Sequence, residues 1–161
     1  MDIIKELKAI TEKLDEEKIE YALCGGLAMA IYGMSRATLD IDVMIEAVSL
    51  LPAKKALMQQ GFTFEAAPMK FEKVKIHRLC KIEDSTGDYL VIDFLITSDR
   101  RNIFENRKIV TWKGGPLSVV SPEGLILLKT FRGNGQDQDD IKYLREILSD
   151  KKMSEDENHE Y

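Results

Sequence analysis

The sequence has few of the residues and segments that mark several classes of protein. Cys24 and Cys80 are its two cysteines, and they form no CxxC pair. Isolated cysteines in apolar surroundings favour buried free thiols over a disulfide framework or a metal cluster. No apolar run approaches the length of a membrane span, and charged residues soon follow Met1. We therefore expect no membrane anchor and no secretion signal, and we expect a cytoplasmic protein.

Excess positive charge is also missing, because 23 Lys and Arg stand against 28 Asp and Glu, for a net charge of −5. This balance disfavours tight, sequence-independent binding to long nucleic acid, which needs many phosphate contacts. It leaves a nucleotide or a brief RNA contact open. The 161 residues are enough for one domain with a proper core. We expect that domain over residues 1–148, and the charged, apolar-poor residues 149–161 predict a disordered acidic tail.

Hydrophobic periodicity predicts an α/β fold, in which a mixed β-sheet is flanked by helices. The strand Val74–Glu83 alternates, with Arg78 and Leu79 against its pattern. The expected strands are Ile19–Cys24, Asp40–Glu46, Phe62–Glu65, Val74–Glu83, Tyr89–Thr97 and a hairpin over 108–120. The expected helices are Asp2–Glu17, Leu27–Tyr32, Ser49–Gln60, 121–132 and Asp137–Leu148.

The segment Cys24–Ile45 carries the strongest chemical pattern. Asp40 and Asp42 stand at positions i and i+2 of an apolar strand, so both carboxylates face the same way. Two such acids repel each other unless a cation lies between them, and Mg²⁺ (or Mn²⁺) suits a few carboxylates, several waters and substrate phosphates. Gly25 and Gly26 allow a ligand to approach the backbone closely, and the helix after them offers N–H groups to an anion. The segment therefore predicts a phosphate site beside a metal site.

The order of these motifs resembles the nucleotidyltransferase superfamily, which shares its fold with DNA polymerase β. The resemblance rests on Gly25-Gly26, a helix, Arg36-x-Thr38 and Asp40-x-Asp42, and it covers roughly residues 19–148. The compact bacterial branch with the AbiEii-type toxins of toxin–antitoxin systems and the antibiotic nucleotidyltransferases looks most similar. Such enzymes transfer a nucleoside monophosphate from an NTP such as ATP to a hydroxyl group and release pyrophosphate. The resemblance also implies a third acid on a later strand.

Asp93 is the candidate for this third acid, because it stands in the middle of the buried-type strand Tyr89–Thr97. Backbone N–H groups in mid-strand are already used in the sheet, which disfavours a purely capped aspartate. The resemblance implies that Asp40, Asp42 and Asp93 are catalytic metal ligands and that Asp93 helps to activate the attacking hydroxyl.

The resemblance further implies that Arg36, Thr38 and Lys129 contact the nucleotide. A turn with an exposed arginine would explain Arg36 and Thr38 equally simply, and Lys129 could be a lysine that extends from an apolar helix to water. The family often shows Lys-Asp-x-x-Asp in the last helix, where this chain has Gln136, Asp137 and Asp140. Helix capping explains Asp137 as well. His77 could be a substrate contact or a general base, although a lone strand histidine is more often structural.

Two classes of function therefore stay open. One is a metal-dependent nucleotidyltransferase whose hydroxyl acceptor could belong to RNA, a protein or a small molecule. The other is a non-catalytic module on the same fold that binds a nucleotide and metal or a partner. The chain is short for the family and has no obvious acceptor-binding domain, so a homodimer could build the cleft.

Overall fold

A computed structural model describes residues 1–35, 37–132 and 135–157. The helices are α1 (Ile3–Glu16), α2 (Gly25–Ile31), α3 (Leu50–Met58, after the 3₁₀ turn Ala47–Ser49), α4 (Arg100–Ile103), α5 (Pro122–Arg132) and α6 (Gly135–Glu157). The strands are β1 (Tyr21–Cys24), β2 (Asp40–Ile45), β3 (Phe64–Glu65), β4 (Met69–Lys70), β5 (Val74–Ile82), β6 (Tyr89–Thr97), β7 (Lys108–Thr111) and β8 (Pro116–Val119).

Within the described residues, eight strands form one sheet in the order β3-β5-β6-β2-β1-β8-β7, with β4 paired to β5. The pairs β2–β6 and β1–β8 are parallel, and the remaining pairs are antiparallel. The predicted α/β fold with a mixed sheet is therefore confirmed. Cys24 is buried as expected, Cys80 is half-buried, and neither forms a disulfide.

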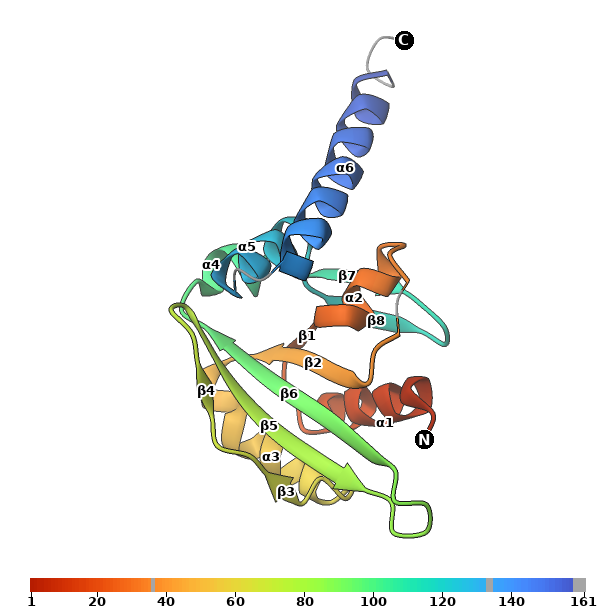
Figure 1. Ribbon diagram of the computed structural model, residues 1–161, viewed down its shortest axis with the longest axis vertical. Helices are drawn as coiled ribbons and strands as arrows, with labels where there is room; N and C mark the ends of the chain where they lie inside the picture. The colour runs from red at the N-terminus through yellow and green to blue at the C-terminus, as the bar shows by residue number, and fades with distance from the viewer. Residues whose placement is uncertain (36, 133–134, 158–161) are drawn as a thin grey trace.

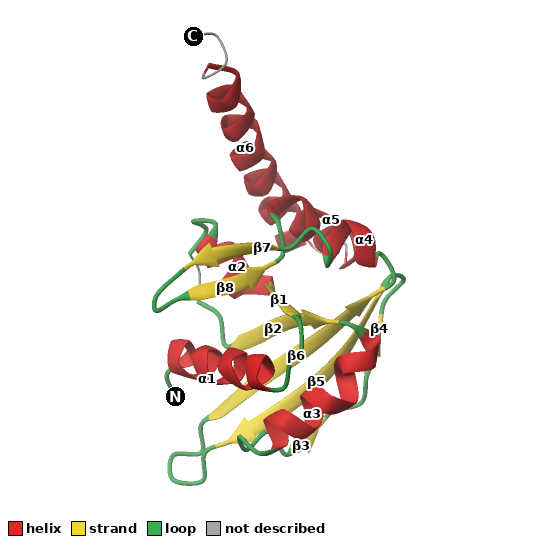
Figure 2. Ribbon diagram, turned by 180° about the vertical axis from the view of Figure 1, so that it is seen from behind, coloured by secondary structure: helices red, strands yellow, loops and turns green. Residues whose placement is uncertain are grey.

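The two faces of the sheet have different surroundings. Helices α1 and α3 lie across one face of strands β2, β6 and β5, as Figure 2 shows. Ile41, Val43 and Phe94 are directed to this face and have no exposed surface. Figure 1 shows the opposite face, where α2 and α5 lie near one end of the strands. Because aspartates 40 and 42 alternate with Ile41 and Val43, they are directed to this second face.

Helix α6 extends away from the rest of the molecule in both overall views (Figure 1 and Figure 2). The sequence predicts an end of this helix at Leu148, and this is wrong, since α6 continues to Glu157. Residues 149–155 contain no glycine or proline that would end the helix, and Lys151, Lys152, Met153 and Glu155 are good helix formers even without packing. The division of the chain at residue 148 stays a prediction. None of the helices in the described ranges is long and apolar enough to cross a membrane.

Candidate active site

The three predicted acids come together on neighbouring strands. Strand β2 carries Asp40 and Asp42, and β6 carries Asp93. In the parallel pairing of these strands, Asp42 is the register partner of Asp93. Alternation places Asp40 on the same face, two residues before Asp42. Register partners on the flanking strands extend this pair into a row across the sheet. Cys24 of β1 pairs with Asp42, and Arg78 of β5 pairs with Asp93.

Gly25 leaves the space that the side chain of Asp42 fills. Its φ angle is +65°, in the left-handed region that side chains disfavour. A Cβ atom at this position would lie 2.1 Å from Oδ2 of Asp42. The first glycine of the pair is therefore required by both its backbone conformation and its contact with the acid. Gly26 follows as the second residue of α2.

Asp93 is held by an arginine that the sequence analysis did not assign to the site. Its Oδ1 and Oδ2 accept hydrogen bonds from Nε and Nη2 of Arg78, each at 2.8 Å. The carboxylate is 2% exposed. Nη2 of Arg78 also lies 3.9 Å from Oδ2 of Asp40. The bond to Asp93, with the charges of Asp40 and Asp42, raises the pKa of Arg78 above its ordinary value. The available signal was the break in alternation at this residue of β5.

The described carboxylates fit a divalent cation at the acid pair rather than at all three acids. Among the described residues, no three His, Cys, Asp or Glu side chains are grouped to hold a metal ion. Asp93 is occupied by the guanidinium. Asp40 is 42% exposed and Asp42 half-buried, and two such carboxylates suit Mg²⁺, which keeps several waters and binds substrate phosphates. The donor set thus suits one cation on β2.

Lys129 belongs to a buried ion cluster between α5 and α6. Its Nζ donates to Oδ2 of Asp140 at 2.7 Å and lies 3.8 Å from Oδ1 of Asp137. The lysine side chain is 8% exposed. It also borders a cavity of about 20 Å³ that Gly25 and Asp42 line, roughly the size of one water molecule. Lys129 and Asp42 therefore border the same small cavity, and the contact of Lys129 with phosphate stays a prediction.

The remaining predicted residues are placed as follows. Oγ1 of Thr38 donates to the carbonyl oxygen of Asp40 at 3.2 Å, so this hydroxyl fixes the turn before β2. Arg36 lies outside the described residues. His77 pairs with Phe94 in the sheet and is directed to the face that α1 and α3 cover, away from the acids. This placement favours the structural interpretation of the histidine.

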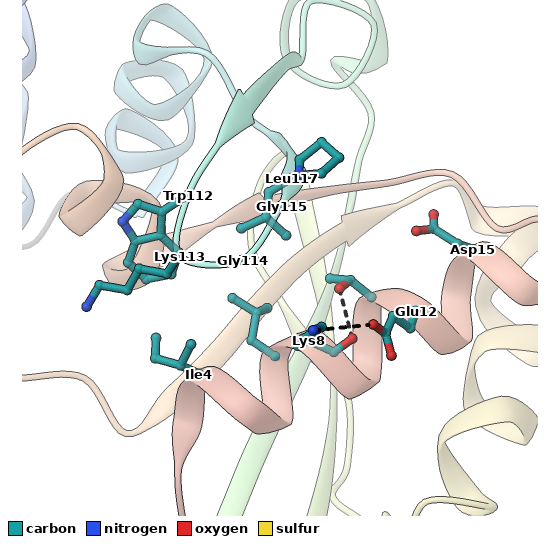
Figure 3. Close-up of a pocket in the computed structure, with 12 residues that line it drawn as sticks. Ile4, Lys8, Glu12, Asp15, Trp112, Lys113, Gly114, Gly115 and Leu117 are labelled. Carbon is teal, nitrogen blue, oxygen red and sulfur yellow. Dashed lines mark hydrogen bonds and ion pairs between the residues drawn. The ribbon is translucent and has the colours of Figure 1, made fainter.

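A cavity between α1 and the β7–β8 hairpin lies apart from the acids. A cavity of about 190 Å³ separates α1 from the β7–β8 hairpin. Figure 3 shows Trp112 and Leu117 on the hairpin side and Ile4, Lys8 and Glu12 on the helix side. None of the predicted site residues lines it. Of the residues that the sequence predicts for the site, Gly25, Asp42 and Lys129 line the smaller cavity instead.

Comparisons with known proteins identify the family and the fold of the chain. The family model for aminoglycoside-2″-adenylyltransferase matches residues 6–98, which include the glycine pair and all three acids. No curated protein matches the chain by sequence. The matched segment covers more than half of the 161 residues.

Solved structures show the same fold at low sequence identity. ANT(2″)-Ia in complex with adenylyl-2″-tobramycin has a TM-score of 0.67 and 13% identity, over 94% of this chain and 92% of its own. A nucleotidyltransferase-type protein from Thermotoga maritima has a TM-score of 0.60 and 18% identity, over 92% and 93%. The lincosamide antibiotic adenylyltransferase LnuA, with lincomycin bound, has a TM-score of 0.57 and 18% identity, over 88% and 95%.

Proposed function

The chain belongs to the aminoglycoside-2″-adenylyltransferase family, and on that premise we propose that this nucleotidyltransferase moves AMP from ATP to a hydroxyl group of a small molecule. The observation that carries the proposal is the row of partners across the sheet. Asp42 and Asp93 are register partners, Asp40 shares their face, and Gly25 makes room for Asp42. An unrelated structural protein would have no need of three acids on adjoining strands.

In the proposed reaction, the acceptor oxygen forms a bond to the α-phosphorus of ATP, and the bond from that phosphorus to the pyrophosphate breaks. Asp40 and Asp42 would hold a divalent cation, which neutralises charge on the triphosphate when bound. Asp93 accepts a hydrogen bond from the acceptor hydroxyl, orients it and takes its proton as the new bond forms. Gly25 keeps the backbone close to the acid pair, where the phosphates enter.

The acceptor class follows from the family and from two of the similar structures. The structure of ANT(2″)-Ia contains adenylyl-2″-tobramycin, and that of LnuA contains lincomycin. We therefore take a small-molecule antibiotic as the acceptor, and aminoglycosides are the first compounds to test. RNA and protein acceptors are the alternatives that the same assay can detect.

The first test is whether ATP stabilises the protein in a Mg²⁺-dependent way. A ligand at 100 times its Kd adds about 2.7 kcal/mol to the free energy of unfolding, which is a clear shift in Tm. We expect this shift for the wild type with ATP and Mg²⁺, and we expect it to be lost in Asp42→Asn. The matched control is Asp84→Asn, which changes an exposed carboxylate in the turn before β6.

The second test is transfer of radiolabelled AMP to a panel of aminoglycosides and lincosamides, with RNA and protein as further acceptors. We expect Asp42→Asn and Asp93→Asn to lower the transfer rate by about 100-fold or more. Full activity in either variant would contradict the proposal. Because Arg78 engages both oxygens of Asp93, binding without turnover is the second candidate. This second candidate predicts that ATP stabilises the protein in a Mg²⁺-dependent way but that no AMP is transferred to any acceptor.

A further inference from the structure

We propose that Arg78 takes the place of a second divalent cation at Asp93, so that the chain binds a single divalent cation, on Asp40 and Asp42, together with ATP. This inference rests on the proposed function. It changes the site expected from the resemblance, in which three carboxylates would share the metal ions.

Arg78 binds both oxygens of the Asp93 carboxylate. Nε and Nη2 of Arg78 each donate at 2.8 Å, one to each oxygen, which is the planar two-bond fork that arginine forms with a carboxylate. The acid is 2% exposed, which leaves little space beside it for a cation with its shell of waters. Mg²⁺ dehydrates reluctantly and keeps several waters. A hydrated cation would therefore have to displace the guanidinium before it could bind Asp93.

The charges on the three strands support the same conclusion. Asp40, Asp42 and Asp93 contribute three negative charges, and Arg78 on β5 contributes one positive charge, with Nη2 at 3.9 Å from Asp40. Among the described residues, the guanidinium therefore offsets part of the negative charge that a second cation would otherwise neutralise. A guanidinium keeps its charge throughout the ordinary pH range.

The arrangement still allows Asp93 and Arg78 to act on an acceptor. Each carboxylate oxygen has a second lone pair and can accept a hydrogen bond from a hydroxyl while it is bound to arginine. Nη1 of Arg78 makes no bond to Asp93, and the side chain is 36% exposed. This nitrogen can donate to the acceptor oxygen or to an α-phosphate oxygen. The guanidinium thus supplies the positive charge that a second metal ion would otherwise bring.

The experiment counts bound cations rather than turnover. Mn²⁺ is titrated into the protein in the presence of α,β-methylene-ATP, and free Mn²⁺ is followed by electron paramagnetic resonance. We expect one bound Mn²⁺ per chain in the wild type and two in Arg78→Met, which frees Asp93. The double variant Arg78→Met/Asp93→Asn should return to one. Lys75→Met removes a cation from the opposite face of the same strand and should also bind one.

Each other outcome overturns the inference in a distinguishable way. Two Mn²⁺ ions in the wild type would show that Arg78 does not exclude the second cation, while the proposed function would stand. One Mn²⁺ in both the wild type and a folded Arg78→Met variant would show that the arginine is not the cause. If no Mn²⁺ binds to the wild type with the nucleotide, the proposed function fails and the inference fails with it.

Discussion

Gly25 and Asp42 illustrate how one missing side chain permits another. In Gly25→Ala, the new Cβ would lie 2.1 Å from Oδ2 of Asp42, and the residue would have to keep a φ of +65°. The left-handed backbone costs about 1–2 kcal/mol for alanine. Displacement of Asp42 should add roughly 1–3 kcal/mol, as overpacking usually does. We therefore expect a lower free energy of unfolding in urea and a weaker Mg²⁺-dependent shift with ATP.

Gly87→Ala separates these two costs. Gly87 has a φ of +75°, and nothing lies within 4 Å of the position of its Cβ. This variant should therefore show the backbone cost of about 1–2 kcal/mol alone and keep the full effect of ATP with Mg²⁺. Equal losses of stability and of nucleotide binding in the two variants would contradict the assigned contact between Gly25 and Asp42.

His77 gives a prediction for the effect of pH on stability. Burial lowers its pKa, and the charges of Lys54 and Lys75 lower it further. The unfolded chain then binds a proton at a higher pH than the folded protein does. The stabilisation from the neutral ring is complete above about pH 6.5 and is lost as the pH falls through the lower pKa of the folded state. We expect the free energy of unfolding to decrease with acidification in this window.

The variant His77→Leu tests this assignment, because leucine fills a similar volume and does not titrate. Urea unfolding at a series of pH values between about 7.5 and 5.5 should show a shallower decrease for the variant than for the wild type. Parallel curves for the two proteins would show that other groups cause the acid destabilisation. Since His77 faces α1 and α3, the variant should keep its Mg²⁺-dependent shift with ATP.

At the scale of elements, the buried cluster at Lys129 joins α5 to α6. Asp140 has no exposed surface, and its Oδ2 accepts a hydrogen bond from Lys129. Lys129→Met leaves Asp137 and Asp140 buried without their shared cation. Breaking a buried ion pair on one side typically costs about 3–5 kcal/mol, and we expect a loss in this range in chemical denaturation.

The control for this cluster is Lys142→Met, which removes an exposed lysine from the same helix α6. Its effect should stay within about 0.5 kcal/mol. The double variant Lys129→Met/Asp140→Leu should regain part of the lost stability, because an apolar pair can replace a buried ion pair. A loss below about 1 kcal/mol in Lys129→Met would contradict the structural role of the cluster.

Element types could be predicted well where the sequence pattern is local. The strand with the acid pair, the strand centred on Asp93 and the helix after Ser121 all appear close to their expected bounds. The contact of Arg78 with Asp93 could not be predicted in the same way. It depends on the register between β5 and β6, which the turn at 84–88 sets. The partner of Lys129 lies on another helix, and no local pattern reveals that pairing.

At the scale of the whole molecule, the sheet separates two kinds of chemistry. One face packs against α1 and α3, and it holds apolar side chains and His77. The other face holds four register partners on neighbouring strands, which are Cys24, Asp42, Asp93 and Arg78. Alternation along each strand predicts the separation once the strands are known. The order of strands in the sheet depends on contacts between segments that lie far apart in the sequence. Local sequence patterns therefore do not predict that β2 and β6 are parallel neighbours.

The parallel pairing of β2 with β6 also determines when the site can form during synthesis of the chain. Strands β1 and β2 can pair early, since a single short helix and a turn connect them. Asp42, however, meets Asp93 only after β3, β4 and β5 have been made and β6 has emerged. Loop closure over such a distance is slow compared with a local hairpin. A growing chain therefore carries two of the three acids for some time before Asp93 joins them, and the full site forms only when the central sheet is complete.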